Sequence, residues 1–253
     1  MMKREDARIY VFGYNKTEYE LPDNELYTPI QCGSLEPGKE RWLAIGDGDS
    51  LDNISDMNHF YAETSGTYWV WKNYPKDLRY IGQCQYRRWL WFDENFDFDE
   101  IFSNADAIMP RPYKMGCDIR SHYRACHNIK DLEAMESVVK ECYPEYFNGF
   151  EAIVNGNVLY YSAGFVMRTE DFERYCSFLF GALSEFRNRL GFVDMDAVDA
   201  HVRQAFENGD YIDPENKEIS YQKLIGGFMA ERLLSTFVIT EFKRQMLFPY
   251  KLF

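Results

Sequence analysis

Hydrophobic residues fall into short continuous runs that are separated by longer amphipathic stretches. The run at 8–13 is rich in β-branched and aromatic residues and ends at a glycine, which is typical of a strand. Apolar runs at 80–84 and 107–109 predict two buried strands, and the segments 42–45 and 158–167 predict two more.

The amphipathic stretches have the spacing of helices. Ser55 can cap a helix that continues to about residue 73, with a proline just beyond its end. Apolar positions recur every three or four residues over 129–142, over 169–190 and over 227–237. Strands and helices that alternate in this way predict a single α/β domain.

We expect this domain to comprise the whole chain, 1–253. No internal repeat, low-complexity tract or linker divides the sequence. The segment 191–220 is polar and contains Gly209 and Pro214, so it predicts a mobile insert within the domain.

The chain is acidic, with 28 Lys and Arg against 41 Asp and Glu and a net charge of −13. Such a surface repels phosphate backbones and anionic lipid headgroups, so a general nucleic-acid-binding protein is excluded. An anionic ligand would bind only where arginine or lysine side chains gather.

The cysteine and hydropathy patterns indicate a cytoplasmic protein. None of the six cysteines stands in a C-x-x-C pair, which suits reduced thiols rather than disulfides or zinc. The charged N-terminus does not resemble a signal peptide, and no apolar run approaches the ~20 residues that cross a bilayer. The basic, aromatic segment 242–253 fits either peripheral contact with a membrane or packing on its own domain.

Three Asp-x-Asp pairs occur, where chance alone gives about 1.4 for this aspartate content, so the motif by itself is weak evidence. Two carboxylates in a loop can hold a divalent cation on a diphosphate. The pair Asp47/Asp49 is the best placed, because it precedes the predicted helix that begins at Ser55. The loop composition is equally typical of a turn, so both interpretations stay open.

A pair of arginines follows a predicted strand. Arg87 and Arg88 come after the apolar run 80–84, and ligands of open α/β sheets bind at the carboxyl ends of strands. Because a guanidinium group binds phosphate bidentately, the pair predicts an anion clamp. The alternative is a surface pair that stacks on Trp89 and Trp91 or pairs with the acidic loop that follows.

Two glutamates stand in predicted helices. Glu231 and Arg232 follow a Gly-Gly pair in an apolar helix, where Glu231 could serve as a general base or form a structural ion pair with Arg232. Glu63 lies in the predicted helix 55–73, whose aromatic stripe we expect in the core, and it needs a partner if it is buried.

Several ordered blocks together resemble a known family. The blocks are Ile9-Tyr10-Val11, Tyr27-Thr28-Pro29-Ile30-Gln31-Cys32-Gly33, Asp49-Ser50-Leu51-Asp52-Asn53-Ile54-Ser55, Asn58 to Asn73, Tyr80-Ile81-Gly82, Tyr86-Arg87-Arg88 and Gly227-Phe228-Met229-Ala230-Glu231-Arg232-Leu233. The family was long described as a domain of unknown function and occurs in bacterial capsule, exopolysaccharide and lipopolysaccharide clusters. Its members are regarded as glycosyltransferases with a GT-A-like fold.

The resemblance implies a single GT-A-like (Rossmann-like) α/β domain with a mixed central sheet flanked by helices. It implies a cytoplasmic enzyme, at the inner face of the cell membrane, that moves a sugar from a UDP-linked nucleotide-sugar donor to a growing glycan or lipid-linked glycan with inversion. A non-catalytic subunit that binds nucleotide-sugar or glycan is the alternative.

The resemblance also implies roles for single residues. Arg87 and Arg88, beside Tyr86, would replace or assist a cation such as Mn²⁺ or Mg²⁺ at the leaving diphosphate, and Glu231 would be the general base. The other donor-binding candidates are Gln31, Gly33, Asp49, Asp52 and Asn53, and the candidates for the acceptor site or its surroundings are Asn15, Lys16, Gly164 and Arg232. No metal ligand is assigned.

The chain departs from the family pattern at several positions. The residues that differ are Asn15 and Gln85, where the family has His, Leu51, where it has Gly, Ala163-Gly164, where it has Asn-Met, and Leu224, where it has Arg. These departures motivate the non-catalytic alternative and leave the fold expectation intact.

Overall fold

The computed structural model describes residues 6–16, 25–93, 96–160 and 164–252. Its centre is an eight-stranded mixed sheet. The strands are β1 (Ala7–Gly13), β2 (Tyr27–Gln31), β3 (Tyr80–Gln85), β4 (Arg88–Leu90), β5 (Ala107–Pro110), β8 (Phe165–Arg168), β9 (Gln245–Phe248) and β10 (Tyr250–Leu252). A separate two-stranded sheet joins β6 (Tyr113–Lys114) to β7 (Val158–Leu159).

Strand β1 lies between two parallel neighbours, β2 and β3, and this parallel trio forms one side of the sheet. Strand β3 pairs antiparallel with β8, which pairs antiparallel with β5. The alternation of side chains along β1 serves two cores: Tyr10 and Phe12 join the larger one, and Ile9 and Val11 join the smaller one on the opposite face.

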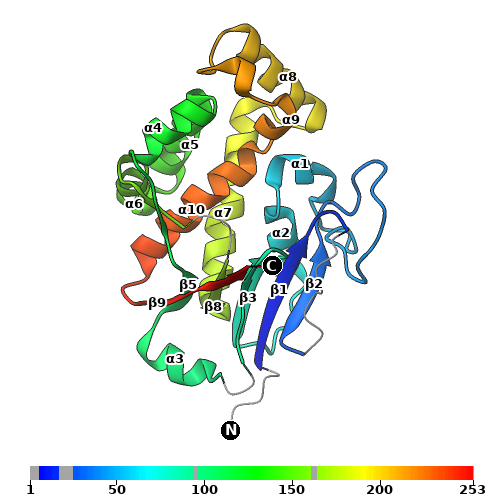
Figure 1. The fold of residues 1–253 in the computed structure, drawn as a ribbon, viewed down its shortest axis with the longest axis vertical. Coiled ribbons are helices and arrows are strands. Elements are labelled where there is room, and N and C mark those ends of the chain that lie inside the picture. Colours follow the sequence, from blue (N-terminus) through cyan, green and yellow to red (C-terminus); the bar gives the residue numbers. More distant parts are fainter. Residues whose placement is uncertain (1–5, 17–24, 94–95, 161–163, 253) are drawn as a thin grey trace.

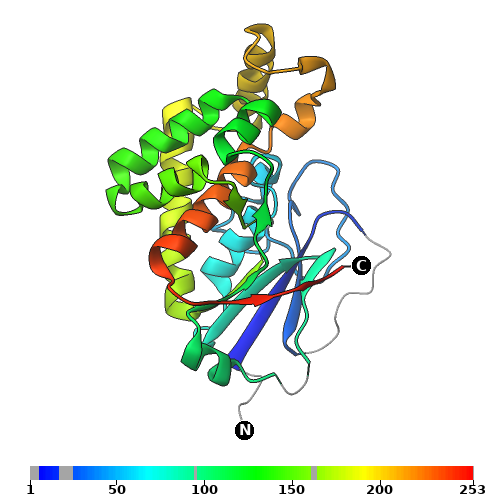
Figure 2. The same ribbon diagram turned by 60° about the vertical axis from the view of Figure 1, so that its left-hand side comes forward.

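Most helices cover one face of the sheet, with α10 and α7 running beside each other across it (Figures 1 and 2). The helices are α1 (Asn58–Tyr61), α2 (Thr64–Asn73), α4 (Ile119–Cys126), α5 (Ile129–Cys142), α6 (Pro144–Asn155), α7 (Thr169–Leu190), α8 (Met195–Glu207), α9 (Ile219–Gln222) and α10 (Ile225–Glu241), with the 3-10 helices η2 (Ser55–Met57) and η3 (Pro214–Asn216). Helix α3 (Phe98–Asn104) packs on the opposite face, in the smaller core. The expected fold class, a mixed central sheet flanked by helices, is confirmed.

The long apolar runs and stripes are predicted well. Strands β1, β3 and β5 confirm the runs at 8–13, 80–84 and 107–109. Helices α5, α7 and α10 confirm the three apolar stripes in the later half of the chain.

Three predicted elements are wrong in part. Residues 42–45 form no strand. The backbone N–H of Trp42 donates a 2.9 Å hydrogen bond to the side-chain oxygen of Gln31 instead of to the backbone of a neighbouring strand. The predicted helix 55–73 is broken at Ala62, whose φ is +52°. The predicted strand 158–167 is divided between β7 and β8, and 161–163 lie outside the described residues.

The segment 191–220, expected as a mobile insert, carries helix α8, and the helix buries Val198, Val202 and Ala205. The ring of His201 lies 2.8 Å from a carboxylate oxygen of Asp131 in α5, which ties this segment to the helical layer. The mobility of the segment and the single-domain extent of the chain stay predictions.

The tail from residue 242 packs on its own sheet. Strand β9 pairs with β5 and β10 pairs with β4, and only Pro249 separates the two tail strands, so the tail connects two parts of the same sheet. Met246 and Leu247 stay partly exposed.

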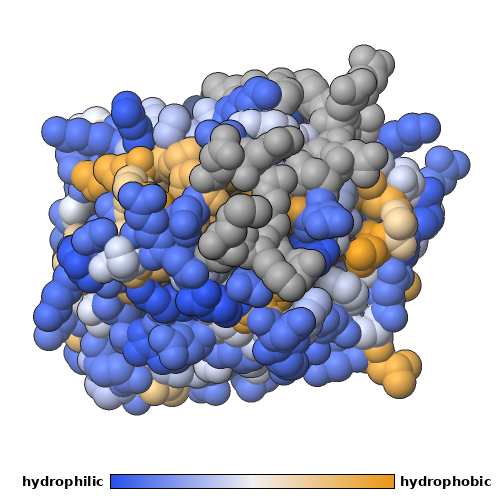
Figure 3. Space-filling view, turned by 90° about the horizontal axis from the view of Figure 1, so that it is seen from below, coloured by the Kyte–Doolittle hydropathy of each residue, from blue (hydrophilic) through white to orange (hydrophobic). Residues whose placement is uncertain are grey.

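In the part of the chain that the structure describes, no helix has the length and apolarity to span a bilayer. The face seen from below is largely hydrophilic, with hydrophobic residues in separate groups (Figure 3). Membrane contact through the tail stays a prediction.

Candidate functional site

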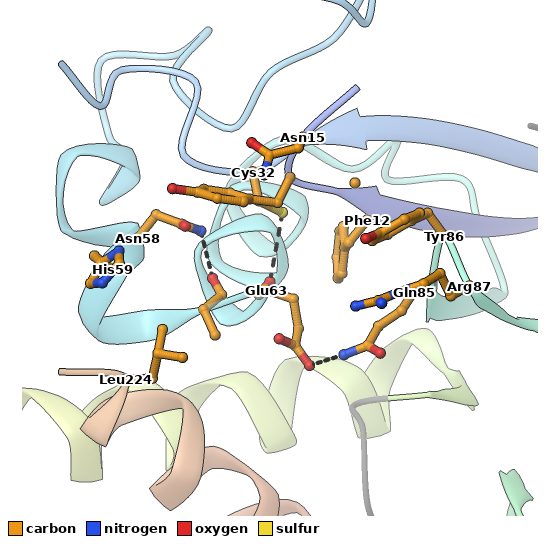
Figure 4. A pocket seen from close by; sticks show the side chains of 13 residues that line it. Phe12, Asn15, Cys32, Asn58, His59, Glu63, Gln85, Tyr86, Arg87 and Leu224 are labelled. Atoms are coloured by element: carbon orange, nitrogen blue, oxygen red, sulfur yellow. Dashed lines mark hydrogen bonds between the residues drawn. The ribbon is translucent and has the colours of Figure 1, made fainter. Parts of the chain in front are cut away.

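A pocket of about 390 Å³ opens at the carboxyl ends of β1 and β3. Most of the lining comes from three chain segments: the residues that end and follow β1, those that end and follow β3, and α1 with the turn after it (Figure 4). Cys32, after β2, and Leu224, before α10, complete it. The lining residues are Phe12, Gly13, Tyr14, Asn15, Cys32, Asn58, His59, Ala62, Glu63, Gln85, Tyr86, Arg87 and Leu224. The carboxyl ends of parallel strands are the usual ligand-binding edge of an α/β sheet.

The turn between α1 and α2 is held in an unusual backbone conformation. Ala62 has φ +52° and ψ −141°, a combination that non-glycine residues rarely adopt. The side-chain amide of Asn58 donates hydrogen bonds to the Ala62 carbonyl and to the Ser65 hydroxyl, both at 2.7 Å. This bonding fixes the turn and places the next residue, Glu63, in the pocket lining.

Asp47 lies behind this turn, with no exposed surface. Its carboxylate accepts five hydrogen bonds, from the backbone N–H groups of Gly33 and Ser34 and from the hydroxyls of Ser34, Ser55 and Ser65. Gly33 has φ +67°, which glycine adopts without strain. The first carboxylate of the best-placed Asp-x-Asp pair therefore ties together the loop after β2, η2 and α2.

Glu63 is half-buried and has one side-chain partner. The amide Nε2 of Gln85 donates to one of its carboxylate oxygens (Figure 4). The amide oxygen of the same Gln85 accepts a 3.4 Å hydrogen bond from Arg88. Arg88 thus stands next to the pocket lining, behind Gln85.

Arg87 is exposed in the pocket lining, with its guanidinium group 5.0 Å from the centre of the Tyr86 ring. It makes no hydrogen bond or ion pair with any described residue. Among the described residues of the lining it is the one arginine or lysine. The structure therefore brings together three of the predicted residues: Arg87, Tyr86 and Asn15.

Cys32 and His59 complete the polar part of the lining. Burial, together with the nearby carboxylate of Asp47, raises the pKa of the Cys32 thiol well above its ordinary value. The Cys32 thiol is therefore neutral at physiological pH and is no nucleophile or metal ligand in this state. A ring nitrogen of His59 lies 3.0 Å from the Ser220 carbonyl.

Besides Gly33 and Arg88, four more predicted donor-binding residues lie outside the pocket lining, and their side chains have other partners. Gln31 is buried and bonds the backbone of the loop 40–43. Asp49 pairs with Arg41 at 2.5 Å, and the hydrogen bond from this guanidinium lowers the pKa of the Asp49 carboxyl.

Asp52 and Asn53 are the other two. Asp52 accepts a 2.7 Å hydrogen bond from the Tyr68 hydroxyl, and Asn53 bonds the backbone of Ser50 and Ser55 on either side of it. Donor contacts by these residues and by Gly33 stay predictions.

The predicted acceptor-side residues are dispersed. Asn15 lines the pocket and accepts a 2.9 Å hydrogen bond from Lys39, while Lys16 is exposed beside it. Gly164 lies instead under the tail, where a side chain would collide with the Tyr250 ring.

Glu231 and Arg232 form an ion pair on α10, with 3.2 Å between Oε2 of the glutamate and a guanidinium nitrogen. Arg232 is 2% exposed and also donates to the Phe228 carbonyl at 2.6 Å. Glu231 does not line the pocket, but it shares a helix face with Leu224, which does, and with Gly227, which packs on Ala62. It therefore stands about two helical turns from Leu224, the nearest lining residue on this helix face.

Glu63, Asn58 and His59 are lining residues that the sequence did not single out as site residues. The one signal for Glu63 was its need for a partner within an apolar helix, which Gln85 supplies. No glycine or proline marks the break at Ala62, so the turn that exposes Glu63 to the pocket has no sequence signature.

The described residues do not fit a bound Mn²⁺ or Mg²⁺. No group of three or more His, Cys, Asp or Glu side chains in the described ranges is arranged to hold a metal ion. The described lining contains Glu63 as its one carboxylate, and hard divalent cations take several oxygen ligands.

Comparison with known proteins adds two findings. Residues 8–206 match the family described as "Domain of unknown function (DUF4422)". The apo structure of WbbM, a bifunctional glycosyltransferase, is similar to this structure with a TM-score of 0.73 and 22% sequence identity. The match covers 98% of this chain and 45% of the WbbM chain, so this chain spans less than half of that protein's length. No curated protein matches the chain in sequence. The likeness to WbbM confirms a fold shared with a glycosyltransferase chain.

Proposed function

This chain belongs to the DUF4422 family, and from that premise we propose that it is a glycosyltransferase that takes a sugar from a nucleotide-sugar donor, UDP-linked, and passes it to a glycan. The observation that carries the proposal is the pocket at the carboxyl ends of β1 and β3, with the guanidinium of Arg87, which no described residue pairs, in its lining. The fold shared with WbbM supports the same class of reaction.

The charge distribution favours a diphosphate in this pocket. The chain carries a net charge of −13, so a phosphate group approaches it only where a cation is available. Arg87 supplies such a cation, and no described residue occupies its hydrogen-bond donors. The next residue, Arg88, donates a hydrogen bond to the side chain of Gln85, which also lines the pocket. Fixed guanidinium groups stabilise the negative charge that develops on a departing nucleotide diphosphate.

The apolar part of the lining suits the flat parts of such a ligand. Tyr14 and Tyr86 contribute half-buried aromatic rings to the pocket lining. Aromatic faces stack on nucleobases and on sugar rings. We propose that these rings hold the base or the sugar while Arg87 holds the diphosphate.

We assign the acceptor side of the reaction to Glu231. A carboxylate two helical turns beyond the lining residue Leu224 would take the proton of an acceptor hydroxyl as that oxygen bonds to the sugar and the sugar–phosphate bond breaks. Attack from the face opposite the leaving group inverts the sugar carbon. Arg232, buried and paired with Glu231, holds the carboxylate in place.

The acceptor that we propose is a growing cell-surface glycan or a lipid-linked glycan, used in the cytoplasm at the inner face of the cell membrane. The partly exposed Met246 and Leu247 of the tail offer a small apolar surface for a peripheral contact there.

Calorimetric titration with UDP and UDP-hexoses, followed by an assay for release of free nucleotide with and without glycan acceptors, tests the proposal. We expect binding of UDP and acceptor-stimulated nucleotide release. Binding of the nucleotide sugar with no release under any acceptor would favour the non-catalytic binding subunit, and absence of any binding would contradict both.

A further inference from the structure

We propose that Glu63 binds a carbohydrate hydroxyl of the ligand, and that Gln85 positions it for that purpose. The inference rests on the proposed function, because it assumes that the pocket receives a nucleotide sugar. It assigns a ligand-binding role to a residue of the turn between α1 and α2.

The bonding of Glu63 is what first distinguishes it. One carboxylate oxygen accepts from the Gln85 amide, and the other accepts no hydrogen bond from any described residue. A half-buried carboxylate with an unoccupied oxygen in a pocket is ready to accept a hydrogen bond from a ligand. By contrast, all five hydrogen bonds to the Asp47 carboxylate come from within the fold.

The backbone gives a second, independent reason. Ala62 is one of two non-glycine residues at positive φ in the described chain, and it directly precedes Glu63. Such a conformation is unfavourable for a residue with a side chain and persists where the surroundings enforce it, often at binding sites. Asn58 enforces it here by bonding the Ala62 carbonyl and Ser65, whose hydroxyl is in turn bonded to Asp47. The position of Glu63 is therefore set before a ligand arrives.

Charge decides which part of the ligand Glu63 can take. A carboxylate repels phosphate oxygens, whereas a hydroxyl group donates to it. Arg87 and Gln85 extend from the end of β3 in the direction of Glu63 (Figure 4), and no ion pair joins Arg87 to Glu63. The pocket thus offers separate cationic and anionic groups, which matches a ligand with a diphosphate next to a sugar ring.

The hydroxyl could come from the ribose or from the transferred sugar, and calorimetry with graded probes separates the two. We would titrate wild type and Glu63→Gln with inorganic pyrophosphate, UDP, UDP-glucose and UDP-galactose. Glutamine keeps the shape and can still accept from Gln85, but it lacks the charge. We expect Glu63→Gln to weaken a carbohydrate-containing probe by roughly tenfold and to leave pyrophosphate within about twofold.

A loss that begins with UDP identifies the ribose, and a loss confined to a UDP-hexose identifies the transferred sugar. Glu40→Gln is the matched control, because Glu40 is exposed on a nearby loop outside the lining. Gln85→Leu removes the donor to Glu63 and should produce the same selective loss to a smaller extent.

Unchanged binding of every probe to Glu63→Gln, or an equal change for pyrophosphate and the nucleotide sugars, would overturn the role of Glu63 and leave the proposed function standing. Failure of wild type to bind any nucleotide probe would overturn the proposed function and this inference together.

Discussion

Two carboxylates at the same end of the sheet show how differently acidic residues can be used. Asp47 is fully buried and accepts five hydrogen bonds from the backbone and from serines. Glu63 is half-buried, accepts one hydrogen bond from the described residues, and faces the pocket. A carboxylate whose oxygens are saturated from within holds the fold together, whereas one with an unoccupied oxygen is available to a ligand. Substitutions around Asp47 should therefore change stability, and substitutions around the pocket should change binding or transfer.

The largest effect should come from Glu231→Gln. We expect acceptor-dependent transfer to fall by about 100-fold or more, because removal of a general base costs roughly 10²–10⁴ in rate. UDP affinity should stay within a few-fold, since Glu231 lies outside the pocket lining. Steady-state transfer kinetics and calorimetry on the same preparation test this, and unchanged turnover would end the assignment of Glu231 as base.

Asp47→Asn should produce the largest loss of stability. The amide can satisfy fewer of the five donors that point at this position, so we expect the free energy of unfolding to fall by about 3 kcal/mol. Urea unfolding measures it. Asp49→Asn is the matched control from the same Asp-x-Asp pair: Asp49 is partly exposed and paired with Arg41, and its loss should cost less than about 1 kcal/mol. Equal losses for the two variants would contradict the comparison.

Arg87→Ala should act on binding alone. Loss of the guanidinium should weaken UDP by about 10- to 100-fold while the urea midpoint stays unchanged, because this side chain has no partner among the described residues other than the Tyr86 ring. Arg124→Ala, an exposed arginine on α4 outside the lining, should leave UDP affinity unaltered. Equal affinity of wild type and Arg87→Ala would remove Arg87 from the donor site.

The smallest effect is expected at Asp131, which is buried like Asp47. Its carboxylate has one partner among the described side chains, the ring of His201 at 2.8 Å. Burial raises its pKa above the ordinary value. The folded state therefore holds this proton more tightly than the unfolded state does. The resulting stability is complete below about pH 4 and is lost as the pH rises through the raised value.

Asp131→Asn removes this dependence. The free energy of unfolding of wild type, measured relative to the variant, should fall as the pH rises above about 4, and the size of the difference at neutral pH should be within about 1 kcal/mol. Urea unfolding at several pH values checks this. If the free energy of unfolding of wild type relative to Asp131→Asn stays constant or grows as the pH rises, the raised pKa of the Asp131 carboxyl is contradicted.

Sequence predicts those strands and helices whose own residues show a complete hydrophobic pattern. Strands β1, β3 and β5 are apolar because they are buried, and α7 has an uninterrupted apolar stripe. The tail strands escape prediction because β9 keeps Met246 and Leu247 partly exposed, and because their pairing partners lie more than a hundred residues away.

The site divides in the same way. Arg87 is predicted correctly as a pocket residue, since its place after a buried strand puts it at the carboxyl edge of the sheet. Which aspartate of the loop 47–53 is bonded from within the fold is not predictable from local sequence, because it depends on donors from Gly33, Ser34 and Ser65 converging on Asp47. Glu63 reaches the pocket through the turn at Ala62, which the surrounding hydrogen bonds enforce and the local sequence does not.

The central claim is that the pocket between the ends of β1 and β3 receives the diphosphate of a nucleotide sugar at Arg87. A crystal structure with bound UDP tests it most directly. The account predicts diphosphate oxygens within hydrogen-bonding distance of the Arg87 guanidinium, with the uridine against the aromatic lining. UDP bound elsewhere on the protein, with Arg87 turned to solvent, would contradict it.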